Sequence, residues 1–152
     1  MATIDDVAAY VVDHFDSSIS TMKLQKLCYM AQGWSLALRG RELFPENFEA
    51  WRNGPVSRDL FRGHRREYSV GRWLPGDSSS LTRDERIVCD AVLNNYGALS
   101  GLQLSELTHR PGTPWSKTRH EAGVPDGASC DRVIPKSRIQ EHFRTALLSA
   151  KD

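Results

Sequence analysis

Apolar residues recur with a helical period over most of the chain. Thr3 precedes the first such run and Asp6 lies three residues later, which is typical of a helix N-terminus. A spacing of three or four residues places the run on one face of a helix. Its members are Ile4, Val7, Ala8, Val11, Val12 and Phe15. We therefore predict a first helix over about 4–15.

The next apolar set covers most of the circumference of a helix. Ser20 or Thr21 can cap its start, and Gly40 is a usual residue just beyond a helix C-terminus. The apolar positions are Leu24, Leu27, Cys28, Met30, Ala31, Trp34, Leu36, Ala37 and Leu38. A polar strip is left at Gln25, Gln32 and Arg39. Because a surface helix carries only one apolar stripe, this pattern predicts a mostly buried central helix over about 21–39.

The rest of the chain alternates between helical patterns and loops. Residues 41–55 have no helical period, and their alternation predicts one short extended segment near 48–52. Pro55 suits the first turn of a third helix. Helices are predicted over about 56–69, 82–96, 100–109, 114–122 and from 135 onward. The sum is an all-α fold, a single compact domain over 1–152 of about seven helices around the buried central one.

Composition restricts the class of protein. The 152 residues include 39% hydrophobic and 26% charged residues, which is typical of a globular chain with one core. No run approaches the roughly 20 apolar residues of a membrane-spanning helix, and the acidic N-terminus lacks the features of a signal peptide. We expect a cytoplasmic protein with no membrane partner. The three cysteines, at unrelated spacings, predict reduced thiols.

The sequence carries none of the common enzyme motifs. A phosphate-binding loop would need GxGxxG or GxxxxGK[ST], and a hydrolase elbow would need GxSxG; all are missing. The five histidines are scattered and do not form metal-ligand spacings. We therefore expect no enzymatic activity, no catalytic residues, no metal and no cofactor.

Positive charge and aromatic side chains gather between residues 51 and 73. Six arginines stand against two acidic residues, and aromatic residues are interleaved with them. This composition is enriched at protein-binding hot spots. The alternative is a solvated helix face whose aromatic side chains turn into the core, with Val56, Leu60, Phe61, His64 and Tyr68 as the inner face.

A second surface could instead bind nucleic acid. The predicted helices over 100–109 and 114–122 are joined by a glycine-containing turn, as in a helix-turn-helix. Lys117, Arg119 and His120 can face phosphate in that arrangement. A DNA-binding repressor is therefore the alternative function, although Trp115 at the second helix favours packing.

Three segments in order resemble a known family. They are Lys23–Trp34 (KLQKLCYMAQGW), Gly40–Phe44 (GRELF) and Glu49–Val56 (EAWRNGPV), followed by Leu107–His109 and Pro114–Trp115. Together they resemble the Panacea domain of SocA-like and phage-associated GepA-like proteins over nearly the whole chain. The resemblance implies an antitoxin of a bacterial or phage toxin–antitoxin system that neutralises a cognate toxin by direct binding. It also implies that the protein can act as an adaptor that delivers the toxin to the ClpXP protease.

The signature motifs do not by themselves separate toxin contacts from fold-shaping residues. Apolar side chains, the turn residues and one tryptophan suit a structural role. These are Leu24, Leu27, Trp34, Gly54, Pro55, Val56 and Trp115. Polar motif positions and the arginines of the third helix are the candidate partner-binding residues. These are Gln25, Lys26, Trp51, Arg52, Asn53, Arg58, Arg62, Arg65 and Arg66.

Overall fold

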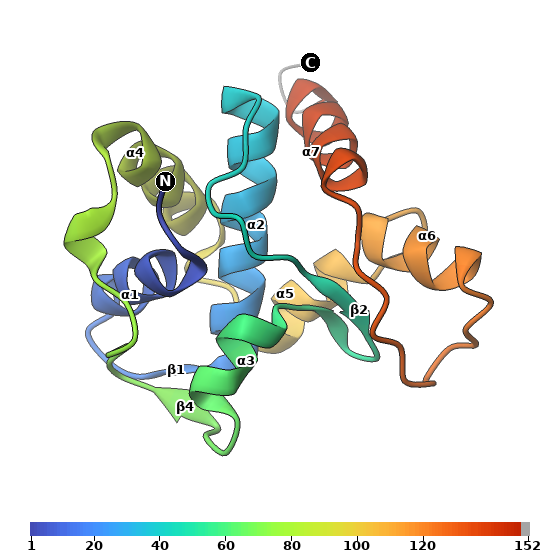
Figure 1. The fold of residues 1–152 in the computed structure, drawn as a ribbon, viewed down its shortest axis with the longest axis horizontal. Coiled ribbons are helices and arrows are strands. Elements are labelled where there is room, and N and C mark those ends of the chain that lie inside the picture. The colour runs from blue at the N-terminus through green and yellow to red at the C-terminus, as the bar shows by residue number, and fades with distance from the viewer. Residues whose placement is uncertain (150–152) are drawn as a thin grey trace.

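A computed structural model describes residues 1–149, in which helix α2 (Thr21–Arg39) runs through the middle of the molecule (Figure 1). The Ser20 hydroxyl accepts a hydrogen bond from the Lys23 N–H at 3.0 Å, which caps the helix start. At the other end Gly40 adopts φ 73°, the left-handed conformation that glycine allows. Every residue from 24 to 36 is buried. The predicted central helix is confirmed.

Six further α-helices surround α2 within residues 1–149. They are α1 (Ile4–His14), α3 (Arg58–His64), α4 (Arg83–Tyr96), α5 (Gly101–Thr108), α6 (Pro114–Glu121) and α7 (Lys136–Ser149). α2 packs most extensively against α7, α5 and α4. α1 and α4 lie on one side of it in Figure 1, and α6 and α7 lie on the other. The predicted all-α architecture of seven helices is therefore confirmed.

Helix starts follow the capping residues of the sequence. Thr3 with Asp6, Thr82 with Glu85, and Ser100 with Gln103 each form a capping box, in which both side chains accept a backbone N–H. Pro114 occupies the first turn of α6, where its missing N–H leaves no hydrogen bond unmade. These local signals explain why most of the predicted helix bounds lie within two residues of the observed ones.

Two short antiparallel pairs of strands accompany the helices. β1 (Ile19–Ser20) pairs with β4 (Ser69–Val70), and β2 (Glu49–Trp51) pairs with β3 (Gly54–Val56). β2 confirms the predicted extended segment. A 3₁₀ turn, η1 (Ser78–Ser80), lies between β4 and α4. The sequence does not predict β1 and β4, because strands of two residues are too short to show a period. It does not predict β3 either, because Pro55 suits the first turn of a helix.

The predicted third helix is wrong at both ends. Pro55 does not open it but lies in β3 opposite Ala50, and Ser57 caps α3 instead. α3 ends at His64, so Tyr68 lies outside the helix and is 88% exposed rather than on an inner face. Leu60 and His64 are buried as predicted. The proline therefore belongs to a hairpin that local spacing did not reveal.

The two glutamines of the polar strip of α2 point inward and organise the surrounding loops. The Gln32 side chain donates to the Phe44 carbonyl at 2.8 Å and accepts from the Leu43 N–H at 2.7 Å. This pairing fixes the loop after α2, because a buried amide must satisfy both its donor and its acceptor. No helix within residues 1–149 has the length and apolar character to cross a membrane.

Candidate partner-binding site

The β2–β3 hairpin presents the central motif of the sequence. Trp51 pairs with Gly54 across a tight turn made by Arg52 and Asn53. Gly54 has φ 119°, a backbone conformation that residues with a Cβ atom rarely adopt. A Cβ atom built there would lie 2.9 Å from Cε of Lys26. The turn therefore needs glycine both for its backbone and for the approach of the lysine.

Buried donors hold the hairpin from behind. The Arg119 guanidinium, on α6, is 3% exposed and donates to the carbonyls of Ala50 (2.9 Å), Pro125 (3.2 Å) and Ala128 (2.6 Å). The Trp115 indole N–H donates to the Trp51 carbonyl at 2.5 Å. These bonds tie β2 to α6 and to the loop before α7, so the hairpin is fixed before any partner arrives.

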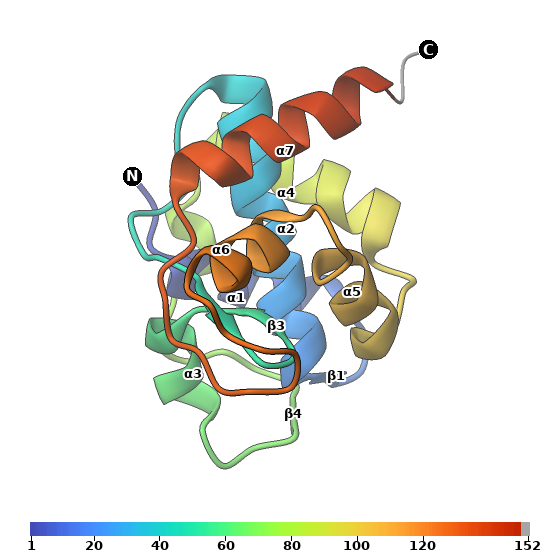
Figure 2. The same cartoon turned by 90° about the vertical axis from the view of Figure 1, so that its right-hand side faces the viewer.

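The loop before α7 pairs with β2 along the side of the hairpin. The Ala50 N–H donates to the Arg132 carbonyl at 2.9 Å, and the Ile134 N–H donates to the Phe48 carbonyl at 2.8 Å. Figure 2 shows this orange segment running alongside the hairpin. It brings residues 129–131 next to β2 although about 80 positions separate them in sequence.

Gln25 connects α2 to the start of α3. Its amide oxygen accepts from the Ser57 N–H at 2.9 Å, and its Nε2 donates to the Ser57 carbonyl at 3.1 Å. The same Nε2 lies 3.0 Å from Nε2 of His64. Because an amide nitrogen only donates, the histidine nitrogen must accept, and the imidazole is neutral. Burial lowers the pKa of His64 from its ordinary value, in agreement with this hydrogen bond.

Lys26 is a buried cation beneath the hairpin. The residue is 2% exposed, and its Nζ donates to the Pro55 carbonyl at 2.9 Å. Within residues 1–149 no carboxylate oxygen lies within 4.0 Å of that nitrogen. Removal from water lowers the pKa of Lys26 from 10.5 to about 7. Within residues 1–149 the Lys26 amino group thus lies under the turn of Arg52 and Asn53 without an anion beside it.

Trp51 and Arg58 form an ordered outer wall. The Trp51 indole N–H donates to Glu49 at 2.8 Å, and its ring packs edge-on against Phe61 with centroids 5.0 Å apart. The Arg58 guanidinium lies 5.3 Å from the indole centroid and pairs with Glu49 at 3.0 Å. Partial burial opposes ionisation of Glu49, but its hydrogen bonds from Arg58 and Trp51 hold its pKa below the ordinary value.

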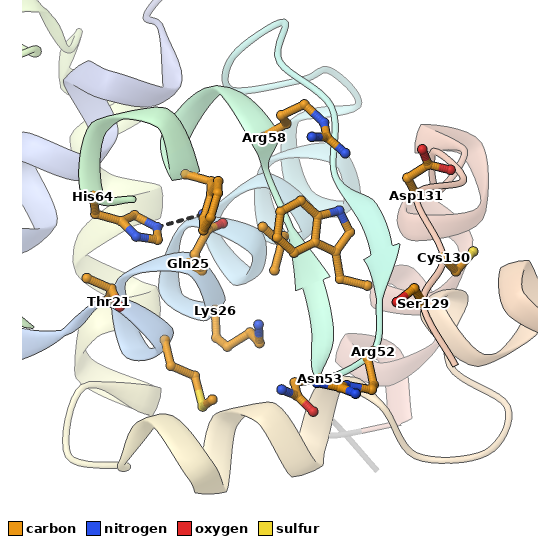
Figure 3. A pocket seen from close by; sticks show the side chains of 14 residues that line it. Thr21, Gln25, Lys26, Arg52, Asn53, Arg58, His64, Ser129, Cys130 and Asp131 are labelled. Carbon is orange, nitrogen blue, oxygen red and sulfur yellow. Dashed lines mark hydrogen bonds between the residues drawn. The ribbon is translucent and has the colours of Figure 1, made fainter. Parts of the chain in front are cut away.

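These elements enclose a pocket of about 620 Å³. Figure 3 shows Lys26 reaching from α2 toward the hairpin, Arg52 and Asn53 at the turn, and Ser129, Cys130 and Asp131 on the facing loop. The lining residues are Thr21, Met22, Gln25, Lys26, Trp51, Arg52, Asn53, Val56, Arg58, Phe61, His64, Ser129, Cys130 and Asp131. Three basic residues and a single acid line it, so its electrostatic character is cationic.

The pocket unites six of the nine predicted partner-binding residues. Gln25, Lys26, Trp51, Arg52, Asn53 and Arg58 line it. Arg62, Arg65 and Arg66 are exposed on α3 and the turn after it, outside the lining. That the nine residues bind a partner stays a prediction. Gln25 and Lys26 are buried and face the pocket, so a partner would meet them only there.

The residues predicted to be structural are mostly buried. Leu24 and Leu27 are inaccessible to solvent, and Trp34 and Trp115 are nearly so. Gly54 and Pro55 are buried in β3, whereas Val56 is half-buried and lines the pocket. Sequence reasoning missed the contribution of Ser129, Cys130 and Asp131. No local signal marks them, because only the pairing of residues 48–50 with 132–134 places them there.

One of the three residues predicted to face DNA phosphate is buried in the structure. Arg119 faces inward and its donors are bound to backbone carbonyls, so the prediction that it faces phosphate is wrong. Lys117 and His120 are exposed. Among residues 1–149, no three histidine, cysteine, aspartate or glutamate side chains are grouped so that they could hold a metal ion.

Comparison with known proteins gives a coherent result. A family model described as "Antitoxin SocA-like, Panacea domain" matches residues 24–116, which span most of α2, the hairpin, α3, α4 and α5. The protein named Antitoxin SocA from Caulobacter vibrioides (strain NA1000 / CB15N) is 34% identical over 134 residues, covering 78% of this chain and 71% of that protein. No solved structure matches the chain.

Proposed function

Because the chain belongs to the SocA-like Panacea-domain family of antitoxins, we propose that it neutralises a cognate toxin by binding it directly over the pocket between α2, the β2–β3 hairpin and α3. The observation that carries this proposal is the fixed hairpin, whose turn residues Arg52 and Asn53 are exposed while its backbone is held from behind. A surface that is already ordered loses little entropy on binding.

The side chains at the rim of the pocket, Trp51 and Arg58, are of the types that bind proteins. Arginine and tryptophan are the residue types most enriched at binding hot spots, and here Arg58 lies over the half-buried Trp51. Arg62, Arg65 and Arg66 extend the positive charge along the exposed side of α3. This surface fits a toxin with an acidic contact region. The role is non-enzymatic, because binding alone masks the toxin.

Charge reversal on the rim tests the proposal. We would express the product of the adjacent reading frame as the toxin, with wild-type protein or with the double variant Arg52→Glu and Arg62→Glu. Arg52 is exposed at the hairpin turn, and Arg62 pairs with Asp59 on its own helix. Growth rescue should be lost and affinity should fall by at least 30-fold, about 2 kcal/mol. Circular dichroism should show unchanged helicity.

Arg83→Glu is the matched control, because Arg83 is exposed at the start of α4, outside the pocket lining. It should rescue growth as the wild type does. Full rescue and full affinity with the double variant would remove this surface from the proposal.

Masking and directed proteolysis predict different fates for the toxin. An adaptor shares the toxin contact but needs a second surface for ClpXP, and we infer masking as the primary action. Rescued cells should therefore keep their toxin level. Loss of toxin that depends on ClpXP would instead establish the adaptor activity.

The DNA-binding alternative predicts a different dependence on salt. A repressor that neutralises phosphates loses affinity steeply as salt rises, because bound counterions are released. We expect no specific binding to the promoter of its own operon at low salt in an electrophoretic mobility assay. Specific, salt-sensitive binding would restore that alternative.

A further inference from the structure

Lys26 is a basic residue that the fold buries without an anion. Its side chain leaves the second turn of α2 and ends under the hairpin, where the Pro55 carbonyl accepts one of its hydrogen bonds. A neutral carbonyl does not balance a charge. An unpaired buried ammonium is costly, and folded proteins normally pair such a group with a carboxylate.

The groups around Lys26 come from every element that packs there. From α3, the neutral His64 faces it and adds no negative charge. From α5, the Thr108 hydroxyl lies near Gly54, and it already donates to the Ser105 carbonyl. Arg52 and Arg58 stand at the rim. None of these neighbours supplies an anion.

The remaining charges on the pocket do not compensate Lys26 either. Asp131 is the single acid among the lining residues and lies on the facing loop. Glu49 is bound by Arg58 at 3.0 Å and by the Trp51 indole at 2.8 Å. Among the lining residues, therefore, no acidic side chain is paired with Lys26.

We propose that a carboxylate side chain of the toxin enters this pocket and pairs with Lys26, with Trp51 and Phe61 as apolar walls for its methylene groups. The inference rests on the proposed function and deepens it by naming the chemistry of the inserted group. A carboxylate accepts only, so it matches the donors of Lys26 and Arg52. A pocket of about 620 Å³ with aromatic walls is larger than a free inorganic anion requires.

Pairing must change the protonation of Lys26. Burial holds the pKa of this group near 7 in the free protein, so at pH 8 most molecules carry a neutral amine. A carboxylate at hydrogen-bond distance favours the charged ammonium and raises the pKa. Complex formation at pH 8 should therefore take up a proton, whereas a partner that leaves the pocket empty would not cause this uptake at Lys26.

The test compares Lys26→Met with Lys23→Met. Both replace a lysine of α2 by an apolar side chain of similar length, but Lys23 donates to the Gly97 carbonyl and does not line the pocket. Toxin recovered from the co-expressed complex would be titrated with each protein by calorimetry at pH 8, in triethanolamine and in Tris, two buffers without anionic groups whose ionisation enthalpies differ. A thermal melt checks that each variant is folded.

We expect Lys26→Met to weaken toxin binding by about tenfold or more and to remove the proton uptake. Lys23→Met should retain both. Asp→Asn and Glu→Gln variants of the toxin would then be combined with Lys26→Met. Neutralising one acidic residue of the toxin should weaken binding to the wild type but not to Lys26→Met, because that variant already lacks the lysine with which the residue pairs.

Three results would overturn the inference. If wild type and Lys26→Met bind the toxin equally, the toxin carboxylate does not reach Lys26, while the proposed function stands. If phosphate alone stabilises the wild type and not Lys26→Met, with toxin affinity unchanged, the pocket takes a free anion. If the wild type does not bind the toxin at all, the proposed function fails and this inference fails with it.

Discussion

Gly54 and Lys26 are mutually dependent at the level of single residues. The glycine has φ 119°, and its missing side chain leaves room for Cε of Lys26 and for the Thr108 hydroxyl. The lysine in turn donates to the next residue of the strand, Pro55. The glycine at position 54 is thus explained by a side chain that comes from a different element.

Gly54→Ala should reduce the free energy of unfolding by about 2 kcal/mol or more, because it adds both backbone strain and a close contact. Gly112→Ala is the control, since Gly112 also has positive φ, 85°, but has open space where a Cβ would lie. It should cost about 1 kcal/mol from backbone strain alone. Urea denaturation measures the free energy of unfolding of both variants. Equal losses would show that the contact with Lys26 does not contribute to the cost of Gly54→Ala.

Lys26 should also make stability depend on pH. Its pKa is about 7 in the folded state against 10.5 ordinarily, so between these values the unfolded chain binds more protons. The free energy of unfolding that Lys26 contributes is therefore fully present above pH 10.5, and it is lost as the pH falls to 7. Relative to Lys26→Met, the wild type should gain roughly 1.4 kcal/mol per pH unit between pH 7.5 and 9.

Chemical denaturation at three pH values in this range measures that difference. At pH 7 the variant should be at least as stable as the wild type, because an apolar side chain of similar volume replaces an unpaired buried charge. A constant difference across the range would contradict a depressed pKa.

At the scale of elements, the hairpin depends on α6 rather than on its own strands. β2 and β3 have three residues each, too few to be stable as an isolated pair. Arg119 binds one carbonyl of β2 and two of the loop before α7. An exposed hairpin turn is thereby made rigid by a side chain that solvent does not reach.

Arg119→Met should therefore destabilise the protein by about 3 kcal/mol or more, since it leaves three carbonyls without their donor. Amide hydrogen exchange should rise in β2 and in the loop before α7 more than in α4. Lys117→Met, an exposed position on the same helix, should change stability by less than about 0.5 kcal/mol. Equal exchange in the two variants would exclude the bracing role of Arg119.

At the scale of the whole molecule, α7 closes the fold against α2. Gly33, in the middle of α2, allows this contact because a Cβ there would lie 2.3 Å from the ring of Phe143. Tyr29 packs against the same ring with centroids 5.9 Å apart. α2 and α7 therefore meet at a glycine, and the Phe143 ring fills the space that a Cβ atom would need.

Gly33→Ala should destabilise the protein by about 2 kcal/mol, and the double variant with Phe143→Leu should be less destabilised than the sum of the single changes. The smaller leucine leaves room for the added methyl group. Thermal denaturation of the four proteins gives the coupling energy. Strict additivity would place the two residues in separate parts of the core.

The sequence alone determined every helix except the bounds of α3, and it determined the buried position of α2. Capping residues and apolar spacing act within a few positions, so Thr3, Thr82, Ser100 and Pro114 mark helix starts without any tertiary contact. The ordered motifs were also sufficient to predict the antitoxin family, which the comparisons confirm.

Only the tertiary structure decided which polar residues face outward. Gln25, Lys26 and Arg119 are polar in sequence, yet each is buried because a distant backbone segment offers a hydrogen-bond partner. The pocket likewise joins α2, the hairpin and residues 129–131 through contacts far apart along the chain. Local spacing carries no information about such pairings, since they depend on how the whole backbone closes.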